Sequence, residues 1–264
     1  MLTLDNIYKT FNKNTANEKL AICGLSMHLN RGDFVTVIGG NGAGKSTVLN
    51  LIAGVYTPDR GNIILDGETI TNLPEYKRAK YLGRVFQDPM MGTAANMEIQ
   101  ENLALAYRRG KRRGLKWGIT RDEKQLYMEK LKDLNLGLEN RMSTKVGLLS
   151  GGQRQALTLL MATLQQPKLL LLDEHTAALD PKTAERVLEL TQHVVTANCL
   201  TTLMVTHNMK HAIQYGNRLI MMYDGNIIFD ISGEEKKKLS VADLLQKFES
   251  ASKGEFANDR MLLS

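Results

Sequence analysis

The sequence predicts an α/β protein with a phosphate-loop core, a largely parallel sheet, an N-terminal antiparallel β part and an inserted helical lobe. Three observations predict this class. Short apolar strands alternate with helical patterns along most of the chain. A glycine-rich segment at 39–47 joins one such strand to a helix. Between 88 and 148 the pattern changes to helix and loop, which indicates an insertion.

The composition is that of an ordinary globular protein and excludes several classes. Of 264 residues, 43% are hydrophobic and 23% are charged, which excludes a disordered or collagen-like chain. No apolar run approaches the ~20 residues that cross a bilayer, and the N-terminus does not resemble a signal peptide. Cys23 and Cys199 are isolated, which favours a reducing cytosol over a disulfide scaffold.

The basic net charge of +6 comes from one stretch. That stretch contains Arg108, Arg109, Lys111, Arg112, Arg113 and Lys116. Without these six residues, 28 basic side chains balance 28 acidic ones, so no nucleic-acid-binding surface is expected. Together with Trp117, the stretch could face anionic lipid or an acidic partner loop, and the alternative is a solvated face.

The predicted elements follow in order along the chain. The first half gives strands at 2–7, 34–38, 62–65 and 82–86, and a helix at 45–53 that stops at Gly54. The second half gives helices at 98–107, 122–134, 153–164, about 180–197, 209–215 and 239–248, and strands at 168–172, 201–205, 218–223 and 226–231. The run 233–238 is expected to be solvated. We assign 1–87 and 149–250 to the α/β core with its β part, 88–148 to the helical lobe, and 251–264 to a C-terminal tail.

A phosphate-binding loop is predicted where the strand at 34–38 meets the helix at 45–53. Its residues are Gly39, Gly40, Asn41, Gly42, Ala43, Gly44, Lys45, Ser46 and Thr47. Glycines let successive backbone N–H groups point toward phosphate oxygens at a helix N-terminus. Lys45 adds a positive charge toward the β- and γ-phosphates of ATP, and the Ser46 hydroxyl can ligate Mg²⁺. The alternative is a glycine-rich turn that merely connects strand and helix.

Two carboxylates follow the leucine-rich strand at 168–172, at the sheet edge where α/β proteins bind ligands. Asp173 suits coordination of Mg²⁺, and Glu174 suits the base that polarises an attacking water. The alternative for this pair is a solvated acidic turn.

A second anion-binding helix start is predicted at Leu149–Gln153. Ser150 can cap the following helix, while Gly151 and Gly152 expose backbone N–H groups. One ATP does not need two such loops in one chain. We therefore predict a two-fold dimer in which each ATP lies between one copy's phosphate loop and the Ser150, Gly151, Gly152 and Gln153 of the other. An ordinary Ser-capped helix is the alternative.

These motifs, in this order, resemble the nucleotide-binding subunit of ATP-binding cassette (ABC) transporters over about residues 1–250. The motifs that carry the resemblance are 39–47, Gln87, 149–153, 173–174, 178–180 and His207. The segment around Gln87 resembles bacterial importers, in particular the amino-acid or tryptophan/tyrosine group. The resemblance implies an ATPase whose cofactor is Mg²⁺ and whose ATP hydrolysis is coupled to transport.

The resemblance also implies roles for single residues. Phe11 would stack on adenine, although Tyr8 is a rival and Phe11 could instead be a core residue at a strand end. Gln87 would reach Mg²⁺ and the attacking water, or be a polar loop residue. Asp180 would order the dimer interface, or only cap its own helix. His207 would bind the γ-phosphate, or be a satisfied buried histidine.

Two further observations concern histidines. His207 and His211 have the spacing of helical zinc ligands but lack a third ligand nearby, so no zinc site is expected. His175 stands where the family usually has proline, which predicts a less stiff loop between Glu174 and Asp180.

The resemblance further implies the partners and the location. We expect a homodimer with a second nucleotide-binding subunit, transmembrane permease subunits and an extracytoplasmic solute-binding protein. The chain would lie peripherally on the cytoplasmic face of the cell membrane, held by the permease. The methionine-rich segment 88–102 would dock the permease, or simply be a packed loop. The alternative function is a non-transport ABC ATPase, such as an iron–sulfur assembly scaffold or a lipid- or division-linked cassette.

Overall fold

The computed structural model describes residues 1–111 and 118–251, which form two compact units. The first unit contains Met1–Arg78 and the chain from Cys199 onward, and the second contains Ala79–Asn198. The predicted core and lobe boundaries at 88 and 148 both fall inside the second unit, and that division by function stays a prediction. The predicted tail beyond 251 lies outside the described residues. No described helix is both long and apolar enough to span a bilayer.

The first unit begins with an antiparallel sheet, as the sequence predicts. Its strands are β1 (Leu2–Phe11), β2 (Lys19–Leu29), β4 (Arg60–Leu65) and β5 (Glu68–Thr69), in the order β2-β1-β4-β5. The sequence analysis missed β2. Its second half alternates buried Leu25, Met27 and Leu29 with exposed Ser26 and His28, a period-two signal of a half-buried strand.

The first unit also holds the strands that carry the glycine-rich loop. They lie in the order β10 (Asn226–Ser232), β9 (Arg218–Tyr223), β3 (Phe34–Ile38) and β8 (Thr201–Val205). Strand β3 is parallel to both β8 and β9, and β9 turns back into antiparallel β10 at Asp224-Gly225. Because β3 and β8 are buried along their whole length, their sequences read as continuous apolar or β-branched runs.

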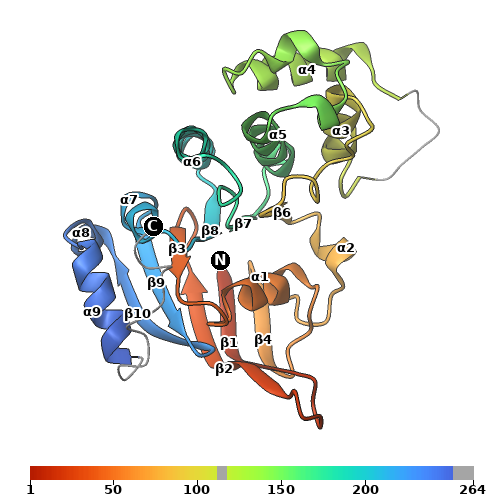
Figure 1. The fold of residues 1–264 in the computed structure, drawn as a ribbon. Helices are drawn as coiled ribbons and strands as arrows, with labels where there is room; N and C mark the ends of the chain where they lie inside the picture. Colours follow the sequence, from red (N-terminus) through yellow and green to blue (C-terminus); the bar gives the residue numbers. More distant parts are fainter. Residues whose placement is uncertain (112–117, 252–264) are drawn as a thin grey trace. The chain divides into compact units, whose positions relative to one another are not determined.

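Helices complete the first unit. They are α1 (Lys45–Ala53), α2 (Glu75–Arg78), α7 (Met209–Gln214), α8 (Gly233–Lys237) and α9 (Val241–Ala251). Figure 1 shows α7, α8 and α9 gathered beside β9 and β10. Phe248 and Leu244 of α9 pack with Ile38 and Met221 in one apolar cluster, which places the last described helix against the strand that precedes the glycine-rich loop.

The expectation that 233–238 is solvated is wrong for one residue. Lys236 is only 1% exposed, although its neighbours in α8 are exposed. Its Nζ donates hydrogen bonds to the carbonyls of Tyr215 and Gly216, directly after α7. Burial lowers the pKa of Lys236 to about 8. The lysine therefore satisfies carbonyl groups at the end of α7 instead of facing water.

A second buried cation stabilises the end of α1. Arg78 is 1% exposed, and its Nη1 donates to the carbonyls of Leu51 and Ile52 in the last turn of α1, at 2.7 and 2.8 Å. Its Nε and Nη2 donate to Leu73 and Thr71. A guanidinium at this end offsets both the unpaired carbonyls and the negative end of the helix dipole.

The second unit combines two parallel strands with four longer helices. Strands β6 (Leu82–Val85) and β7 (Leu169–Asp173) pair in parallel. The helices are α3 (Ile99–Tyr107), α4 (Arg121–Lys132), α5 (Gly151–Thr163) and α6 (Pro181–Ala197), with short 3-10 turns at Leu138–Arg141 and Val146–Leu148. Each predicted helix in this unit begins and ends within about two residues of the observed one.

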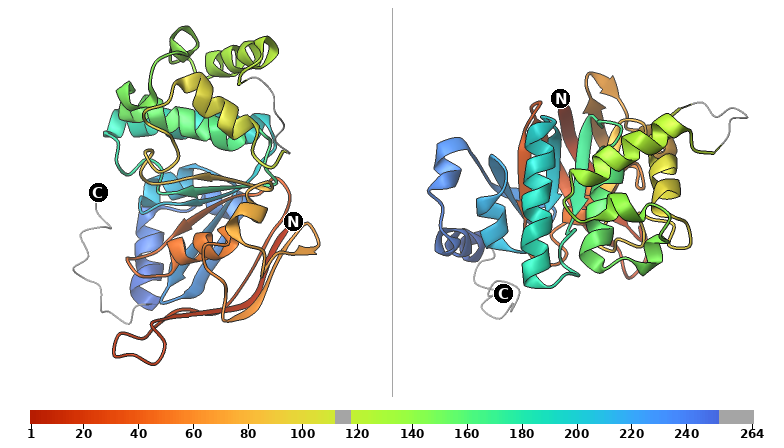
Figure 2. Two further views of the ribbon diagram at one scale, coloured as in Figure 1. Left: turned by 90° about the vertical axis from the view of Figure 1, so that its right-hand side faces the viewer. Right: turned by 90° about the horizontal axis from the view of Figure 1, so that it is seen from above.

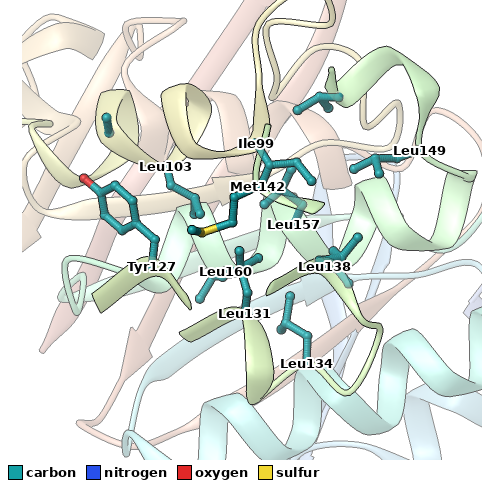
Figure 3. Packing of buried hydrophobic residues seen from close by; sticks show 13 residues of the cluster. Ile99, Leu103, Tyr127, Leu131, Leu134, Leu138, Met142, Leu149, Leu157 and Leu160 are labelled. Atoms are coloured by element: carbon teal, nitrogen blue, oxygen red, sulfur yellow. The ribbon is translucent and has the colours of Figure 1, made fainter. Parts of the chain in front are cut away.

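Helices α3, α4 and α5 share one apolar core. Figures 1 and 2 show the three helices side by side, and Figure 3 shows the side chains between them. Leu103 from α3, Leu131 from α4 and Leu157 from α5 are each fully buried there. The apolar stripes that predicted amphipathic helices therefore face one another.

The described residues of the basic stretch contact other groups of the same chain. Arg108 forms an ion pair with Glu123, with 2.8 Å between Nη2 and Oε2. Arg109 donates to the carbonyl of Ala162, and the Lys111 ammonium lies 3.7 Å from the ring centroid of Tyr107. Arg112, Arg113, Lys116 and Trp117 lie outside the described residues. The first three cations thus have intramolecular partners, which weakens the case for a lipid-facing surface.

Candidate functional site

The glycine-rich loop follows β3 and has a backbone that only glycine adopts readily. Gly39, Gly42 and Gly44 have φ values of 152°, 80° and 98°. A Cβ on Gly39 would lie 2.2 Å from the carbonyl oxygen of Met222, and one on Gly44 would lie 2.7 Å from Ile22 Cδ1. The loop is therefore packed against β9 and β2, and its glycines are required by both conformation and space.

Lys45 lies over this loop, where a phosphate-binding lysine is expected. Its side chain is 6% exposed, and its Nζ donates to the carbonyls of Gly39 (2.7 Å) and Gly40 (3.1 Å). The loop thus folds around the ammonium group, which is a concentrated positive charge with several donors. A nucleotide phosphate entering the loop would meet this charge together with the N-terminus of α1.

The other residues of the predicted loop differ in their exposure. Asn41 and Gly42 are exposed, whereas Ala43 is buried and its carbonyl accepts from Gly225 N at 3.2 Å. Ser46 is exposed in the first turn of α1, and Thr47 is half-buried beside it. The turn at Asp224-Gly225 is therefore hydrogen-bonded to the glycine-rich loop, a contact that was not predicted from the sequence.

Within the first unit, His207 lies beside the start of the loop. Val37 of β3 pairs with Val205 of β8, and Thr206 N donates to Val37 O at 3.1 Å. Continuing this parallel register by two residues places His207 next to Gly39. His207 is partly exposed and precedes α7. Its role in binding the γ-phosphate stays a prediction.

Phe11 and Tyr8 both belong to β1 but have different neighbours. Phe11 ends the strand, is half-buried and meets Tyr56 edge to face at 5.1 Å between ring centroids. An added Cβ on Gly24 would lie 2.9 Å from the Tyr8 hydroxyl, so Tyr8 lies against β2. Both rings are half-buried, and the stacking role of Phe11 stays a prediction.

The second unit brings Gln87, Asp173 and Glu174 to one edge of its strand pair. Val85 of β6 pairs with Leu172 of β7 in parallel, so the residues that follow the two strands leave the pair at the same edge. Gln87 is exposed, and both carboxylates are half-buried. Arg84, which was not predicted from the sequence, lies beside them: its Nη2 is 3.9 Å from Asp173 Oδ2, and its guanidinium is 4.5 Å from the Phe86 ring centroid.

Oxygen atoms are the ligands that Mg²⁺ prefers, and the predicted set supplies them. The first unit offers the Ser46 hydroxyl, and the second offers the Gln87 amide oxygen and the Asp173 carboxylate. No cluster of three or more His, Cys, Asp or Glu side chains that could hold a metal occurs within 1–111 and 118–251. The donor set therefore fits an ion held partly by phosphate oxygens, as Mg²⁺ is in nucleotide complexes.

Asp180 caps α6, which is the simpler of the two roles considered for it. Its Oδ1 accepts from Thr183 N at 3.1 Å, and Pro181 occupies the first helical position. Hydrogen bonds from Thr183 lower the pKa of Asp180, so it is ionised at neutral pH. The carboxylate is exposed, and its role at a dimer interface stays a prediction.

Ser150 and Gln153 form a reciprocal cap at the start of α5. Ser150 Oγ accepts from Gln153 N at 3.3 Å, and Gln153 Oε1 accepts from Ser150 N at 3.2 Å. Ser150 and Gly151 are exposed, whereas Gly152 is buried against α6. An added Cβ on Gly152 would lie 2.3 Å from Thr183 Cγ2. The two helices that begin at Ser150 and Asp180 therefore meet at their N-terminal turns.

This close approach gives a testable pair of substitutions. Gly152→Ala should lower the free energy of unfolding by about 1–3 kcal/mol, because the new methyl group collides with Thr183 Cγ2. Adding Thr183→Ser removes that methyl but keeps the hydroxyl and backbone N–H that bind Asp180, so the double variant should regain most of the loss. Urea unfolding of the two single variants and the double variant measures this coupling. Additive losses would contradict the predicted contact.

Comparison with known proteins places these motifs in context. The family model described as ABC transporter matches residues 22–177. A tyrosine transport ATP-binding protein of Clostridioides difficile is 48% identical over 251 residues, which cover 95% of this chain and all of the relative. A methionine import ATP-binding protein, MetN, of Streptococcus agalactiae is 31% identical over 86% of this chain and 63% of its own length.

Solved structures agree with these sequence relatives. A dimeric ATP-binding cassette in a post-hydrolysis state, bound to ADP and Pi, matches with a TM-score of 0.75 and 29% identity over 88% of this chain and 98% of the other. A cassette of an ABC transporter in its ADP conformation matches with a TM-score of 0.79 and 28% identity, covering 97% and 99% of the two chains. Together they confirm the predicted fold class.

Proposed function

The chain belongs to the ABC transporter family and is an ATP-binding, ATP-hydrolysing subunit of it, and on this premise we propose that it energises an importer for tyrosine or a similar amino acid. The observation that carries the choice of solute is the 48% identity to a tyrosine transport ATP-binding protein along that relative's entire length. The named relatives are transport proteins, which favours transport over the assembly-scaffold alternative.

We propose that the glycine-rich loop holds the phosphates of ATP. Lys45 would exchange its contacts with the Gly39 and Gly40 carbonyls for phosphate oxygens, because an anionic oxygen attracts the ammonium group more strongly than a neutral carbonyl does. Ser46, Gln87 and Asp173 would hold Mg²⁺, which when bound offsets the negative charge of the β- and γ-phosphates. Phe11 would bind the adenine ring by stacking.

Hydrolysis needs a group that accepts a proton from water and groups that stabilise the departing phosphate. We propose Glu174 as the base that polarises the attacking water, with Gln87 at the same edge of the strand pair to orient the same water. His207 would donate a hydrogen bond to the γ-phosphate from its position beside Gly39. ADP and inorganic phosphate then leave with the water oxygen bonded to phosphorus.

A second copy of the chain would complete each site. Under this proposal, Ser150, Gly151, Gly152 and Gln153 of one copy contact the ATP held by the loop of the other. The exposure of Ser150 and Gly151 in the isolated chain and the dimeric cassette among the similar structures support it. Asp180, which starts the helix packed on Gly152, would lie at the same interface.

A patch on the second unit suits the permease. Met90, Met91 and Leu148 are 42%, 70% and 73% exposed, which is unusual for apolar side chains of this size. Arg154 joins them, since it contacts Met90 Sδ and donates to the carbonyl of Gly147. In the sequence, Met90 and Met91 come shortly after Gln87, and Leu148 comes shortly before Ser150. A permease segment bound to the patch could therefore respond to movements of both residues. A solute-binding protein would serve the same permease outside the membrane.

Copurification from native membranes tests the proposal. A tagged chain should isolate with an integral-membrane protein, and cells lacking the chain should lose uptake of labelled tyrosine while other amino acids enter normally. Isolation with a soluble assembly protein alone would contradict the transport function. Loss of uptake of a different solute would keep the transport function but reject tyrosine.

A further inference from the structure

His175, the residue after Glu174, is buried where the sequence predicted a loop of reduced stiffness. It is 2% exposed, although it lies two residues after the end of β7 and is followed by exposed residues at 177 and 178. Its Nε2 lies 3.1 Å from Oγ1 of Thr191 in α6, and Thr191 is fully buried. The ring of His175 is thus hydrogen-bonded to a helix, at the position where the family resemblance led us to expect proline.

The direction of this hydrogen bond follows from the second contact of Thr191. The Thr191 hydroxyl donates its one proton to the carbonyl of Val187 at 2.7 Å. Its oxygen can therefore only accept at His175, and the His175 Nε2 carries the hydrogen. Both groups are satisfied without water, so the bond has a defined geometry in a buried setting.

The backbone at Glu174 needs such an anchor. Glu174 has a φ of 43°, in the left-handed region that a side chain with a Cβ rarely occupies. A conformation of this kind persists only where the residues around it fix it. On one side, the ladder of β7 with β6 runs to Leu172, and the next residue, Asp173, forms an ion pair with Arg84 at 3.9 Å. On the other side, the Glu174 carbonyl accepts from Ala177 N at 2.9 Å, and His175 reaches α6.

Both ends of the loop that follows Glu174 are hydrogen-bonded to α6. Asp180 caps α6 through Thr183 N, and His175 binds Thr191 further along α6. A shift of α6 therefore moves Glu174 through His175 as well as through the chain.

We propose that His175 is a positioning residue for hydrolysis: its hydrogen bond to Thr191 holds Glu174 in its left-handed conformation and couples that carboxylate to α6. His175 itself touches neither ATP nor water. This inference rests on the proposed role of Glu174 as the base.

Three variants of the full-length chain test the hydrogen bond. His175→Phe keeps a buried ring but has no donor, and Thr191→Val keeps the shape of threonine but has no acceptor. Each should lower kcat for ATP hydrolysis about 10–100-fold, because small displacements of a reacting group have costs of this size. KM for MgATP should stay within about two-fold, since the loop that holds ATP is unchanged. His175→Gln, which retains an N–H near the position of Nε2, should restore most of kcat.

The controls separate a positioning role from a loss of folding. Thr196→Val, an exposed threonine on the same helix, should leave kcat and KM unchanged. Thr191→Ser keeps the hydroxyl and should behave like the wild type. The double variant His175→Phe, Thr191→Val should lose no more activity than either single variant, because both remove the same bond.

Two outcomes would overturn the inference. One is unchanged kcat in folded His175→Phe and Thr191→Val; the other is a rise in KM with kcat unchanged. If Glu174→Gln also keeps its activity, the proposed role of Glu174 fails with it. If Glu174→Gln loses hydrolysis while the His175 and Thr191 variants do not, only the role of His175 fails.

Discussion

Glu174→Gln is expected to bind ATP, lose hydrolysis and accumulate as a long-lived dimer. Loss of a general base lowers the rate by about 10²–10⁴-fold, and the uncharged amide leaves the surrounding backbone unchanged. ATP that binds but is not cleaved keeps the two copies together. Phosphate release measures the first effect, and light scattering after gel filtration in Mg-ATP measures the second.

The matched control for this variant is Glu129→Gln, an exposed glutamate in α4 of the same unit. It should retain both the wild-type rate and the wild-type oligomeric behaviour. A Glu174→Gln chain that stays monomeric in saturating ATP would contradict the composite site, and one that hydrolyses ATP at the wild-type rate would remove Glu174 from the mechanism.

Lys45→Ala is expected to abolish turnover chiefly by weakening ATP binding. Its ammonium is the buried charge at the centre of the glycine-rich loop. Hydrogen bonds to charged groups contribute about 1.5–3 kcal/mol, which corresponds to about 10–150-fold in affinity. Equilibrium binding of a fluorescent ATP analogue, followed by an ATPase assay, measures both effects.

The control for the lysine variant is Lys77→Ala. Lys77 is an exposed lysine in α2 of the same unit. This variant carries the same loss of charge without touching the loop. Wild-type binding and turnover in Lys45→Ala would show that the loop does not hold phosphate. Loss of binding in both variants would instead point to an effect of overall charge.

Features that depend on residues close together in the chain could be predicted from the sequence. Gly39, Gly44 and Lys45 follow a buried strand at fixed intervals, and the structure shows why two of these positions must be glycine. The cap by Ser150 was likewise predicted, because the residue and the helix start are adjacent in the chain, whereas the reciprocal hydrogen bond from Gln153 was not. Such contacts depend on neighbours in the chain.

Contacts between distant segments could not be predicted in this way. The bond from His175 to Thr191 joins a strand end to the third turn of a helix, and nothing in the spacing of the two residues indicates it. Phe248 packs on the loop from the last described helix, since an added Cβ on Gly40 would lie 3.3 Å from its ring. Lys236 was expected in water because its neighbours are charged, yet tertiary packing buries it.

The proposed composite site would explain why one chain carries two loops suited to anions. The backbone of the loop at Gly39 requires glycine at several positions, and Ser150 and Gly151 at the other loop are exposed. Each loop belongs to a different compact unit of the chain. Two-fold pairing would give each loop a phosphate to bind and would make the two sites equivalent.

Complementation between two inactive variants tests this central claim most directly. Ser150→Asp keeps a helix-capping side chain but places a negative charge where the partner's phosphate would arrive. Homodimers of Lys45→Ala and of Ser150→Asp should both be inactive. In mixed dimers, isolated through a different tag on each chain, one site carries both defects and the other carries neither. We predict that the mixed dimers regain up to half of the wild-type ATPase rate, whereas mixed dimers as inactive as their parents would show that each ATP is served by one chain alone.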